Sequence, residues 1–383
     1  MSRSRDLLDL LSRSRPARLD PPPGPDDAQA VAAITAEERP AVLHAEPRAR
    51  RTPVKALTSV GAAAAVVAVV VTAGAIASRD TSPDPGEGAG TTSAPRAAPG
   101  DAGRLLLAAA ERNDTAASGG GRYLTMQTEY GVAVPVSAAG GSYTMIEKSL
   151  DQYWLARPGA GRSWVIVQSL GATPATAADE AAWQRAGSPA VVKVTEPKPY
   201  ELRTTPGKVQ GNPVNRDNLF AIGNRNMSQK QLDALPTGPA ALRKMLIGTF
   251  DGGGGDMPTD RDQWLLGVTA SLVVGLPVSN PVRAAAYRLL AELPGVRELG
   301  TVRDVRGRAG QAVAFVQDSP ERGSFEVRLI IDTDTGRALA QERRAVRPRG
   351  RSSWIAPGTL VGYEAVLVSE STDDSPPKPD IVN

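Results

Sequence analysis

The stretch "LIIDTDTGRALAQE", residues 329–342, decides the fold class. Apolar and polar residues alternate on both sides of its centre, which is typical of half-buried strands. The Asp332–Gly336 sequence between them supplies turn residues, and Gly336 can adopt a positive φ angle. The stretch therefore predicts an antiparallel hairpin.

Other segments on both sides of this hairpin follow one of two periodicities. Alternation typical of strands is found at 122–130, 142–157, 163–170, 296–305, 309–317, 324–346 and 360–372. Helical patterns are found at 104–112, 236–250, 260–277 and 280–295. Strands therefore precede and follow an inserted helical segment. This order predicts an α+β fold in which the later strands complete one antiparallel sheet with the earlier ones.

The composition excludes several kinds of chemistry. The chain has 383 residues, no cysteine and a single histidine, His44. Within one chain, the lack of cysteine excludes disulfides, thiolate metal sites and Cys nucleophiles. The single histidine excludes a His-based triad and a multi-His zinc site. We expect a protein that is not an enzyme, with no catalytic, cofactor-binding or metal-ligating residues and no bound cofactor.

Residues 56–78, "ALTSVGAAAAVVAVVVTAGAIAS", carry no charged side chain. About 20 mostly apolar residues cross the hydrocarbon layer of a bilayer, so this stretch predicts one transmembrane helix. A buried helix of a soluble protein is an alternative, although such helices seldom run this long without a charge. A signal peptide is the other alternative, since Ala75-Ile76-Ala77 fits a small-residue cleavage site and leaves cleavage after Ala77 open.

The charged residues around this stretch predict its orientation in the membrane. Four basic residues, Arg48, Arg50, Arg51 and Lys55, precede it, and only Arg79 follows closely. Basic flanks stay in the cytoplasm. We therefore expect a single-pass protein of the cell membrane with its N-terminus inside and its C-terminal domain outside. The expected parts are a cytoplasmic tail at 1–55, the span at 56–78, a Pro/Gly-rich linker at 79–103, an extracytoplasmic α+β domain at 104–370 and a disordered tail at 371–383.

The N-terminal tail contains two features that fit a docking segment. Leucines in "DLLDLL", residues 6–11, fall on one face of a short helix, and a Pro-bounded motif follows at 13–27. A tail of this length with few large apolar groups cannot build a core alone. A tail without structure of its own is the alternative to a segment that orders on a cytoplasmic partner. The expected docking residues are Leu7, Leu8, Leu10, Leu11, Arg18, Leu19 and Asp20.

Four motifs suggest binding chemistry, and each has a simpler interpretation. "DGGGGD", residues 251–256, lacks the Lys-Ser/Thr of a phosphate loop and is interpreted as a flexible loop. Asp332 and Asp334 lack the spacing of a calcium loop and fit the hairpin turn. "SPPK", residues 375–378, has nucleophile spacing but no helix to carry it. A basic cluster is interpreted as a solvated strand end, or else as a contact for anionic headgroups or polymers. It comprises Arg343, Arg344, Arg347, Arg349 and Arg351.

Several phrases in this order resemble one protein family. They are "RSRPARLDP" in the tail, "LPTGPAALRKML", "NPVRAAAYRLLAELPGV" and "LIIDTDTGRALAQE". Together they resemble an actinobacterial family of single-pass membrane proteins of unknown function, typically encoded beside extracytoplasmic-function sigma factors. The resemblance implies an inner tail, one span, an outer domain and coupling to transcription. It supplies no ligand and no catalytic residues. By a looser analogy, the outer part is similar to curved-sheet sensor and lipoprotein-carrier folds.

Two functions follow as hypotheses. The first is a membrane-anchored, non-enzymatic regulator whose outer domain senses a ligand or envelope state and whose tail docks a sigma factor or another cytoplasmic regulator. The alternative is an extracytoplasmic carrier of lipid or lipoprotein, in which one helix covers an apolar cleft of the sheet. The expected cleft residues are Trp264, Leu265, Leu272, Val273 and Leu276, and simple core packing is the other interpretation of the same residues. Nucleic acid is not an expected partner.

Overall fold

The computed structural model describes residues 100–116, 119–138, 141–194, 200–214, 219–377 and 380–381. These residues have the expected α+β class, with one large antiparallel sheet and few helices. The helices are α4 (Asp101–Thr115), α5 (Ala177–Arg185), α6 (Gln229–Asp233), α7 (Pro239–Ile247), α8 (Arg261–Val274), α9 (Asn280–Glu292) and the short 3-10 helix η2 (Gly350–Ser352). The strands of the first half are β1 (Tyr123–Ala138), β2 (Gly141–Ala156), β3 (Ser163–Pro174), β4 (Val191–Val194), β5 (Tyr200–Arg203), β6 (Val209–Val214), β7 (Phe220–Ile222) and β8 (Arg225–Met227). Those of the second half are β9 (Arg297–Arg303), β10 (Ala309–Ser319), β11 (Gly323–Ile331), β12 (Ala338–Pro348), β13 (Leu360–Thr372) and β14 (Asp380–Ile381).

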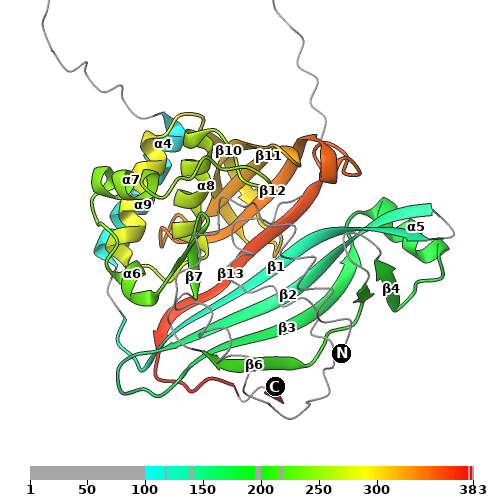
Figure 1. Cartoon of the computed structure of the whole chain (residues 1–383), viewed down its shortest axis with the longest axis horizontal. Coiled ribbons are helices and arrows are strands. Elements are labelled where there is room, and N and C mark those ends of the chain that lie inside the picture. Colours follow the sequence, from blue (N-terminus) through cyan, green and yellow to red (C-terminus); the bar gives the residue numbers. More distant parts are fainter. Residues whose placement is uncertain are drawn as a thin grey trace, which may run out of the picture. The chain divides into compact units, whose positions relative to one another are not determined.

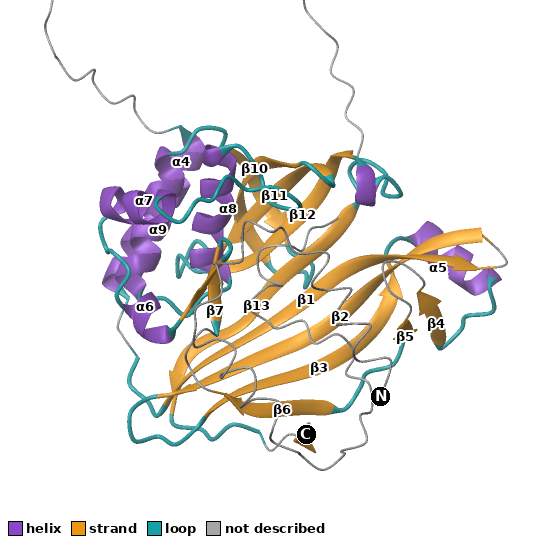
Figure 2. Cartoon of the chain, in the orientation of Figure 1, coloured by secondary structure: helices purple, strands orange, loops and turns teal. Residues whose placement is uncertain are grey.

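One sheet joins both halves of the described chain. Its strand order is β14-β6-β3-β2-β1-β13-β12-β11-β10-β9. The two halves meet where β1 pairs antiparallel with β13, from Tyr123 opposite Thr372 to Val132 opposite Gly362. Figures 1 and 2 show this sheet curving, with α4, α7, α8 and α9 gathered at its β9–β12 end. The prediction that the later strands complete the earlier sheet is confirmed.

The hairpin that decides the class forms as expected between β11 and β12. The backbone N–H of Gly336 donates to the carbonyl of Asp332 over 2.8 Å, and Gly336 has a φ angle of +69°. The Asp332 carboxylate accepts from the Asp334 N–H and the Thr335 hydroxyl. Asn113 of α4 donates from its side chain to the Gly336 carbonyl over 2.8 Å, which fixes the turn against the helix. The aspartates therefore act as turn residues.

The main core lies between the helices and one face of the sheet, here called the helix-bearing face. Helix α8 packs against β10, β12 and α9, and α9 also packs against α4 and α7. Asp260 caps α8 by accepting from the Gln263 N–H over 2.8 Å. The fully buried sheet residues of this core include Val313, Phe315, Val327 and Leu329. Burial of this apolar surface is the main source of stability for the described fold.

The opposite face of the sheet contains a close contact between Tyr363 and Gly131. A Cβ atom at Gly131 would lie 2.0 Å from Cε1 of the Tyr363 ring, so the ring covers the glycine backbone directly. The Tyr363 hydroxyl donates to the Glu129 carboxylate over 2.6 Å, and burial raises the pKa of Tyr363. Arg306 also pairs with Glu129, at 2.8 Å. These contacts fix the register at the β1–β13 junction.

Two expected domain boundaries differ from the structure. Helix α4 begins at Asp101, inside the expected 79–103 linker, because an acidic residue in the first turn favours the helix N-terminus. The expected disordered tail at 371–383 contains the end of β13 and the residues of β14. Strand β14 pairs parallel with β6 and covers the edge of that strand.

The expected transmembrane helix at 56–78 and the tail at 1–55 lie outside the described residues. In the part of the chain that the structure describes, none of the helices has the length and apolar character needed to cross a membrane.

Candidate functional site

A line of polar residues crosses the middle of the sheet. Tyr130 of β1 lies directly opposite Ser149 of β2 on one side and Glu364 of β13 on the other. Glu364 in turn lies opposite Gln341 of β12. We call Ser149, Tyr130, Glu364 and Gln341 the polar row. Directly opposed residues project from the same face of a sheet, so the four side chains share one face.

That face is the helix-bearing face. Gln341 lies opposite Leu329 of β11, which belongs to the main core. Tyr153, two residues beyond Asp151 on β2, belongs to the same core. The polar row therefore continues the core surface toward β2, where polar side chains replace apolar ones.

Glu364 is the most deeply buried member of the polar row, with 9% of its surface exposed. Among the described residues, no hydrogen bond or close ion pair reaches its carboxyl. Burial raises the pKa of Glu364 from the ordinary 4.5 to about 7, and the charge of Arg343 acts in the opposite direction. A carboxyl in this environment changes its charge near neutral pH.

Arg343 of β12 lies diagonally across from Glu364. Burial lowers its pKa to about 10, with a further contribution from Arg322. Its guanidinium lies over the Phe325 ring, with its central carbon 5.3 Å from the ring centre. The Nε atom of Arg343 and the Oε1 atom of Gln341 are buried, and the described residues supply no hydrogen-bond partner for either. One donor atom and one acceptor atom beside Glu364 therefore lack a hydrogen bond, which is unusual in a folded interior.

Two tyrosines and an aspartate complete the surroundings of Glu364. Burial raises the pKa of Tyr130 well above 10, and the charges of Glu364 and Asp151 add to this effect. The Tyr153 hydroxyl is buried and interacts with the same two carboxyls. The Ser149 hydroxyl donates to Asp151 over 3.1 Å. Tyr130, Ser149 and Asp151 are only half-buried, so the site keeps access to solvent on this side.

The five residues expected to line an apolar cleft all lie in the packed core. Trp264, Leu265, Leu272, Val273 and Leu276 are each at most 4% exposed and belong to the cluster between the helices and the sheet. None of them lines the pocket described below. Their placement fits the interpretation as core, to which α8 contributes Trp264, Leu265, Leu272 and Val273. The seven expected docking residues of the tail lie outside the described residues.

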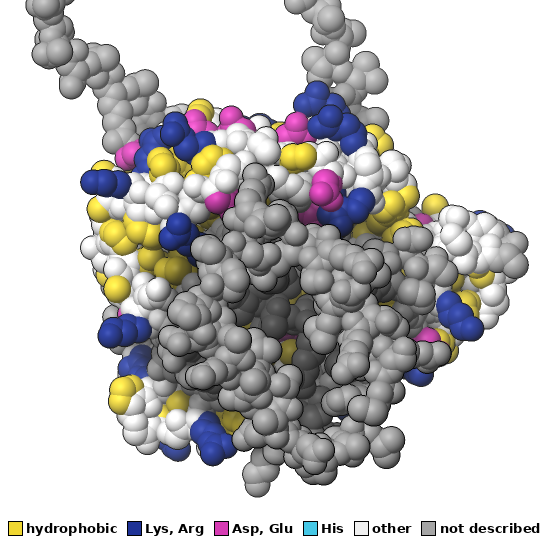
Figure 3. Space-filling view, in the orientation of Figure 1, with side chains coloured by type: hydrophobic (Ala, Val, Ile, Leu, Met, Phe, Trp, Pro, Cys, Tyr) yellow, Lys and Arg dark blue, Asp and Glu magenta, His cyan; other side chains and the backbone are white. Residues whose placement is uncertain are grey.

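The basic cluster at 343–351 does not form one free positive surface. Arg344 pairs with Glu342 at 3.0 Å, and Arg349 pairs with Asp318 at 3.1 Å. Arg351 pairs with both Asp256 and Glu321. On the face that Figure 3 shows, Lys and Arg side chains occur in small separate groups, several of them beside carboxylates. These ion pairs leave less charge for an anionic polymer than the sequence suggests.

The glycine-rich segment at 251–256 is a loop, as expected. Gly252, Gly253, Gly254 and Gly255 all have positive φ angles. Its last residue, Asp256, accepts from Arg322 over 2.8 Å and is therefore part of an ion pair. Among the described residues, no group of three or more His, Cys, Asp or Glu side chains could hold a metal ion.

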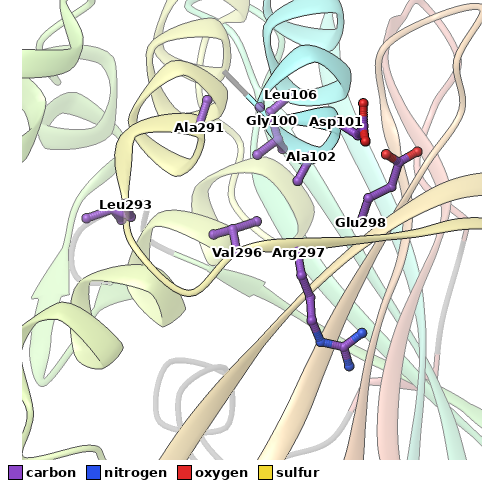
Figure 4. Close-up of a pocket in the computed structure, with 10 residues that line it drawn as sticks. Gly100, Asp101, Ala102, Leu106, Ala291, Leu293, Val296, Arg297 and Glu298 are labelled. Atoms are coloured by element: carbon purple, nitrogen blue, oxygen red, sulfur yellow. The ribbon is translucent and has the colours of Figure 1, made fainter. Parts of the chain in front are cut away.

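A pocket of about 360 Å³ lies where α4 begins, between α9 and β9. Figure 4 shows Ala102, Leu106, Leu293 and Val296 around it, with Asp101 and Glu298 at one side. Arg297 at its border pairs with Glu326. The pocket is open to solvent, and the residues described around it include no buried polar group without a partner. It therefore has weaker features of a binding site than the polar row.

Sequence reasoning did not identify the polar row, although one signal for it exists. Glu364 is the only charged residue in "LVGYEAVLV", residues 360–368. A carboxylate in an otherwise apolar strand indicates either a partner or a function. The register that brings Tyr130 and Gln341 beside it joins distant parts of the chain and could not be read from the alternation alone.

These features define an antiparallel-sheet α+β domain with a partly buried polar site on its helix-bearing face. No family model matches the chain, and no curated protein matches it. Among solved structures, a chain in the complex structure of Pseudomonas aeruginosa MucA/MucB is similar, with 12% sequence identity and a TM-score of 0.19. The match covers 70% of this chain and 56% of that one, so this chain spans little more than half the length of its structural neighbour. A likeness at this level carries no argument about function.

Proposed function

We propose that this protein is a membrane-anchored, non-enzymatic regulator. Its α+β domain senses a ligand outside the membrane, and its N-terminal tail binds a sigma-factor-type partner inside. The observation that carries the sensing role is Glu364 at the centre of the polar row, a largely buried carboxyl for which the described part of the chain supplies no hydrogen bond or ion pair. A ligand that binds the folded domain and donates to this carboxyl would stabilise the domain.

The sequence supports the two-sided arrangement. The uncharged stretch at 56–78 follows four basic residues, and this pattern favours a cytoplasmic tail. The resemblance to a family encoded beside sigma factors supports a transcription-related partner. The carrier hypothesis has no comparable support, since the five apolar residues proposed for a cleft are packed in the core.

The test of this function is co-purification of the full-length protein from membranes of its own host. We expect a sigma factor or its direct regulator to be recovered with the wild-type chain. The double substitution Leu7→Asp and Leu10→Asp places charges on the apolar face of the predicted tail helix and should abolish the recovery.

The matched control is Thr35→Asp, which adds a charge in the same tail beyond the predicted docking residues and should leave recovery unchanged. If the wild-type chain recovers no transcription factor, or if the double variant recovers it equally well, the proposed regulatory role is wrong.

A further inference from the structure

We infer that the outer edge of β9, together with the pocket at its start, is a docking surface for an extended segment of a partner protein. The segment adds a strand to the sheet and places one large apolar side chain in the pocket. This surface is separate from the polar row and adds a second contact to the proposed function. The inference follows from an open strand edge, from the lining of the pocket and from the charge at its border.

The outer edge of β9 is open. In the described part of the chain, β9 is the last strand of the ten-stranded sheet and pairs with β10 alone. No backbone hydrogen bond joins β9 to any other described segment. None of its seven residues is buried. This edge therefore presents backbone donors and acceptors to solvent, and an added strand can pair with them.

The hairpin between β9 and β10 determines which backbone groups of β9 face outward. The Asp304 N–H donates to the Arg308 carbonyl over 2.9 Å, so the backbone of Asp304 points toward β10. Backbone groups alternate in direction along an antiparallel strand, and the pairing is regular as far as Thr301. The N–H and C=O groups of Arg303 and Thr301 therefore point away from β10. An added strand can bond to both residues without disturbing the β9–β10 pairs.

The pocket at the start of β9 provides a place for a side chain of the added strand. Figure 4 shows Val296 and Glu298 beside it, near the first turn of α4. Its apolar lining comes from α4, α9 and the residues between α9 and β9: Ala102, Leu106, Ala291, Leu293 and Val296. Its volume of about 360 Å³ falls within the range of roughly 300–1,000 Å³ that is usual for ligand pockets. In strand addition, backbone bonds give affinity and such side-chain pockets give specificity.

The border of the pocket favours a basic side chain in the partner. Glu298 is exposed, and the described residues supply no hydrogen bond or ion pair for its carboxylate. Asp101 lies on the same side of the pocket and pairs with Arg104. Arg297 pairs with Glu326. The charge left at this border is therefore negative, and a Lys or Arg of the partner complements it.

Other segments of the same chain fit this surface poorly. The stretch that leads to α4, residues 79–99, contains no Val, Leu, Ile, Met or aromatic residue, so it has no large apolar side chain for the pocket. The C-terminal strand β14 pairs with β6 at the opposite edge of the sheet. Full antiparallel pairing of β9 with β9 of a second copy would place Arg297 opposite Arg303, and like charges directly opposite are destabilising.

The occupant is therefore an extended segment of a different protein. Val296 and Glu298 are two positions apart and both line the pocket. Alternate residues of a strand share one face, so the matching segment carries a large apolar residue and a Lys or Arg two positions apart. The charged side chains of β9 hinder unselective pairing and leave the choice of partner to these two side chains.

The experiment is fluorescence anisotropy with the full-length protein in lipid nanodiscs. The probe is the fluorescein-labelled peptide Thr-Lys-Thr-Leu-Thr-Thr-amide, whose lysine and leucine lie two positions apart. We expect saturable binding, and binding at least about tenfold weaker when aspartate replaces the leucine. Two further forms of the peptide carry N-methyl groups on one or the other alternate set of amides. Methylation of the set that faces β9 should abolish binding, whereas methylation of the other set should leave it unchanged.

Variants of the protein test the pocket and its border separately. Ala291→Leu fills the pocket from the last turn of α9 and should weaken binding of the probe at least about tenfold. The matched control, Ala241→Leu, adds the same side chain at an exposed position of α7 and should leave binding unchanged. Glu298→Gln should weaken binding of the lysine peptide about threefold and leave binding of a peptide with glutamine in place of lysine unchanged. A merely structural role of Glu298 would affect both peptides.

Three binding results would overturn the inference: the probe does not bind, both N-methylated forms bind as the parent peptide does, or Ala291→Leu binds the probe as tightly as wild type. Sedimentation velocity covers the remaining occupant, because a wild-type dimer that Ala291→Leu converts to a monomer would assign the edge to a second copy and also overturn it. The peptide series on the wild-type chain decides the matter even if Ala291→Leu fails to fold. Since the peptide assay does not involve the tail partner, loss of peptide binding with co-purification intact refutes only this inference.

Discussion

Replacing Glu364 with glutamine should change how the stability of the domain depends on pH. In the folded protein, the pKa of Glu364 is raised from 4.5 to about 7 by burial. The folded state therefore binds a proton more tightly than the unfolded chain. Its contribution to stability is fully present below pH 4.5 and is lost as pH rises through 7. Glutamine resembles the protonated acid at every pH and should remove this loss.

The magnitude follows from the size of the shift. Each pKa unit corresponds to about 1.4 kcal/mol, so a rise from 4.5 to about 7 gives about 3 kcal/mol. The difference in unfolding free energy between Glu364→Gln and wild type should therefore increase by about 3 kcal/mol from pH 4 to pH 8. Other titrating groups, His44 among them, contribute equally to both proteins and cancel in the difference.

The assay is urea unfolding of the full-length protein, followed by tryptophan fluorescence without added ligand. All five tryptophans lie between residues 154 and 354, so the signal reports this domain alone. Glu370→Gln is the control and should follow the wild-type pH dependence. A difference between Glu364→Gln and wild type that stays constant from pH 4 to pH 8 would refute the claim that burial raises the pKa of Glu364.

Three further substitutions test the packing of the fold by the same urea assay. Gly131→Ala should destabilise the domain by about 1–3 kcal/mol, because the new Cβ would collide with the Tyr363 ring. The control is Gly120→Ala, whose new Cβ would have no atom within 4 Å and should change stability little. Leu272→Ala should lower the unfolding free energy by about 2–5 kcal/mol, because its side chain is fully buried in the core between the helices and the sheet. A smaller loss would indicate a cleft at this position instead of a packed core. Asn113→Ala removes the hydrogen bond from α4 to the hairpin turn and should cost about 1 kcal/mol; no change would show that the turn holds without it.

The sequence predicts most of the large elements because their signals are local. Three such signals each determine an element by themselves: the turn at Asp332–Gly336, the alternation in 360–372 and the apolar run at 260–277. Small strands such as β6 and β7 were not predicted, because three to six residues give too little periodicity.

The candidate site could not be predicted because it depends on register between distant strands. Glu129 and Tyr363, which fix the β1–β13 junction, are 234 positions apart in sequence. A shift of one residue at this junction would turn Glu364 and Tyr130 to opposite faces. The composition of each strand alone gives no information about that choice. Only the assembled sheet brings Tyr130, Glu364 and Gln341 into one row.

The central claim is that one chain works on two sides of a membrane, and cysteine labelling tests it most directly. The protein has no native cysteine, so single substitutions report one position each. Ser353 is exposed next to η2 in the domain, and Ser12 lies in the tail. We expect a membrane-impermeant maleimide to label Ser353→Cys in intact cells and Ser12→Cys only after lysis. Equal labelling of both positions in intact cells, or labelling of neither before lysis, would contradict the account.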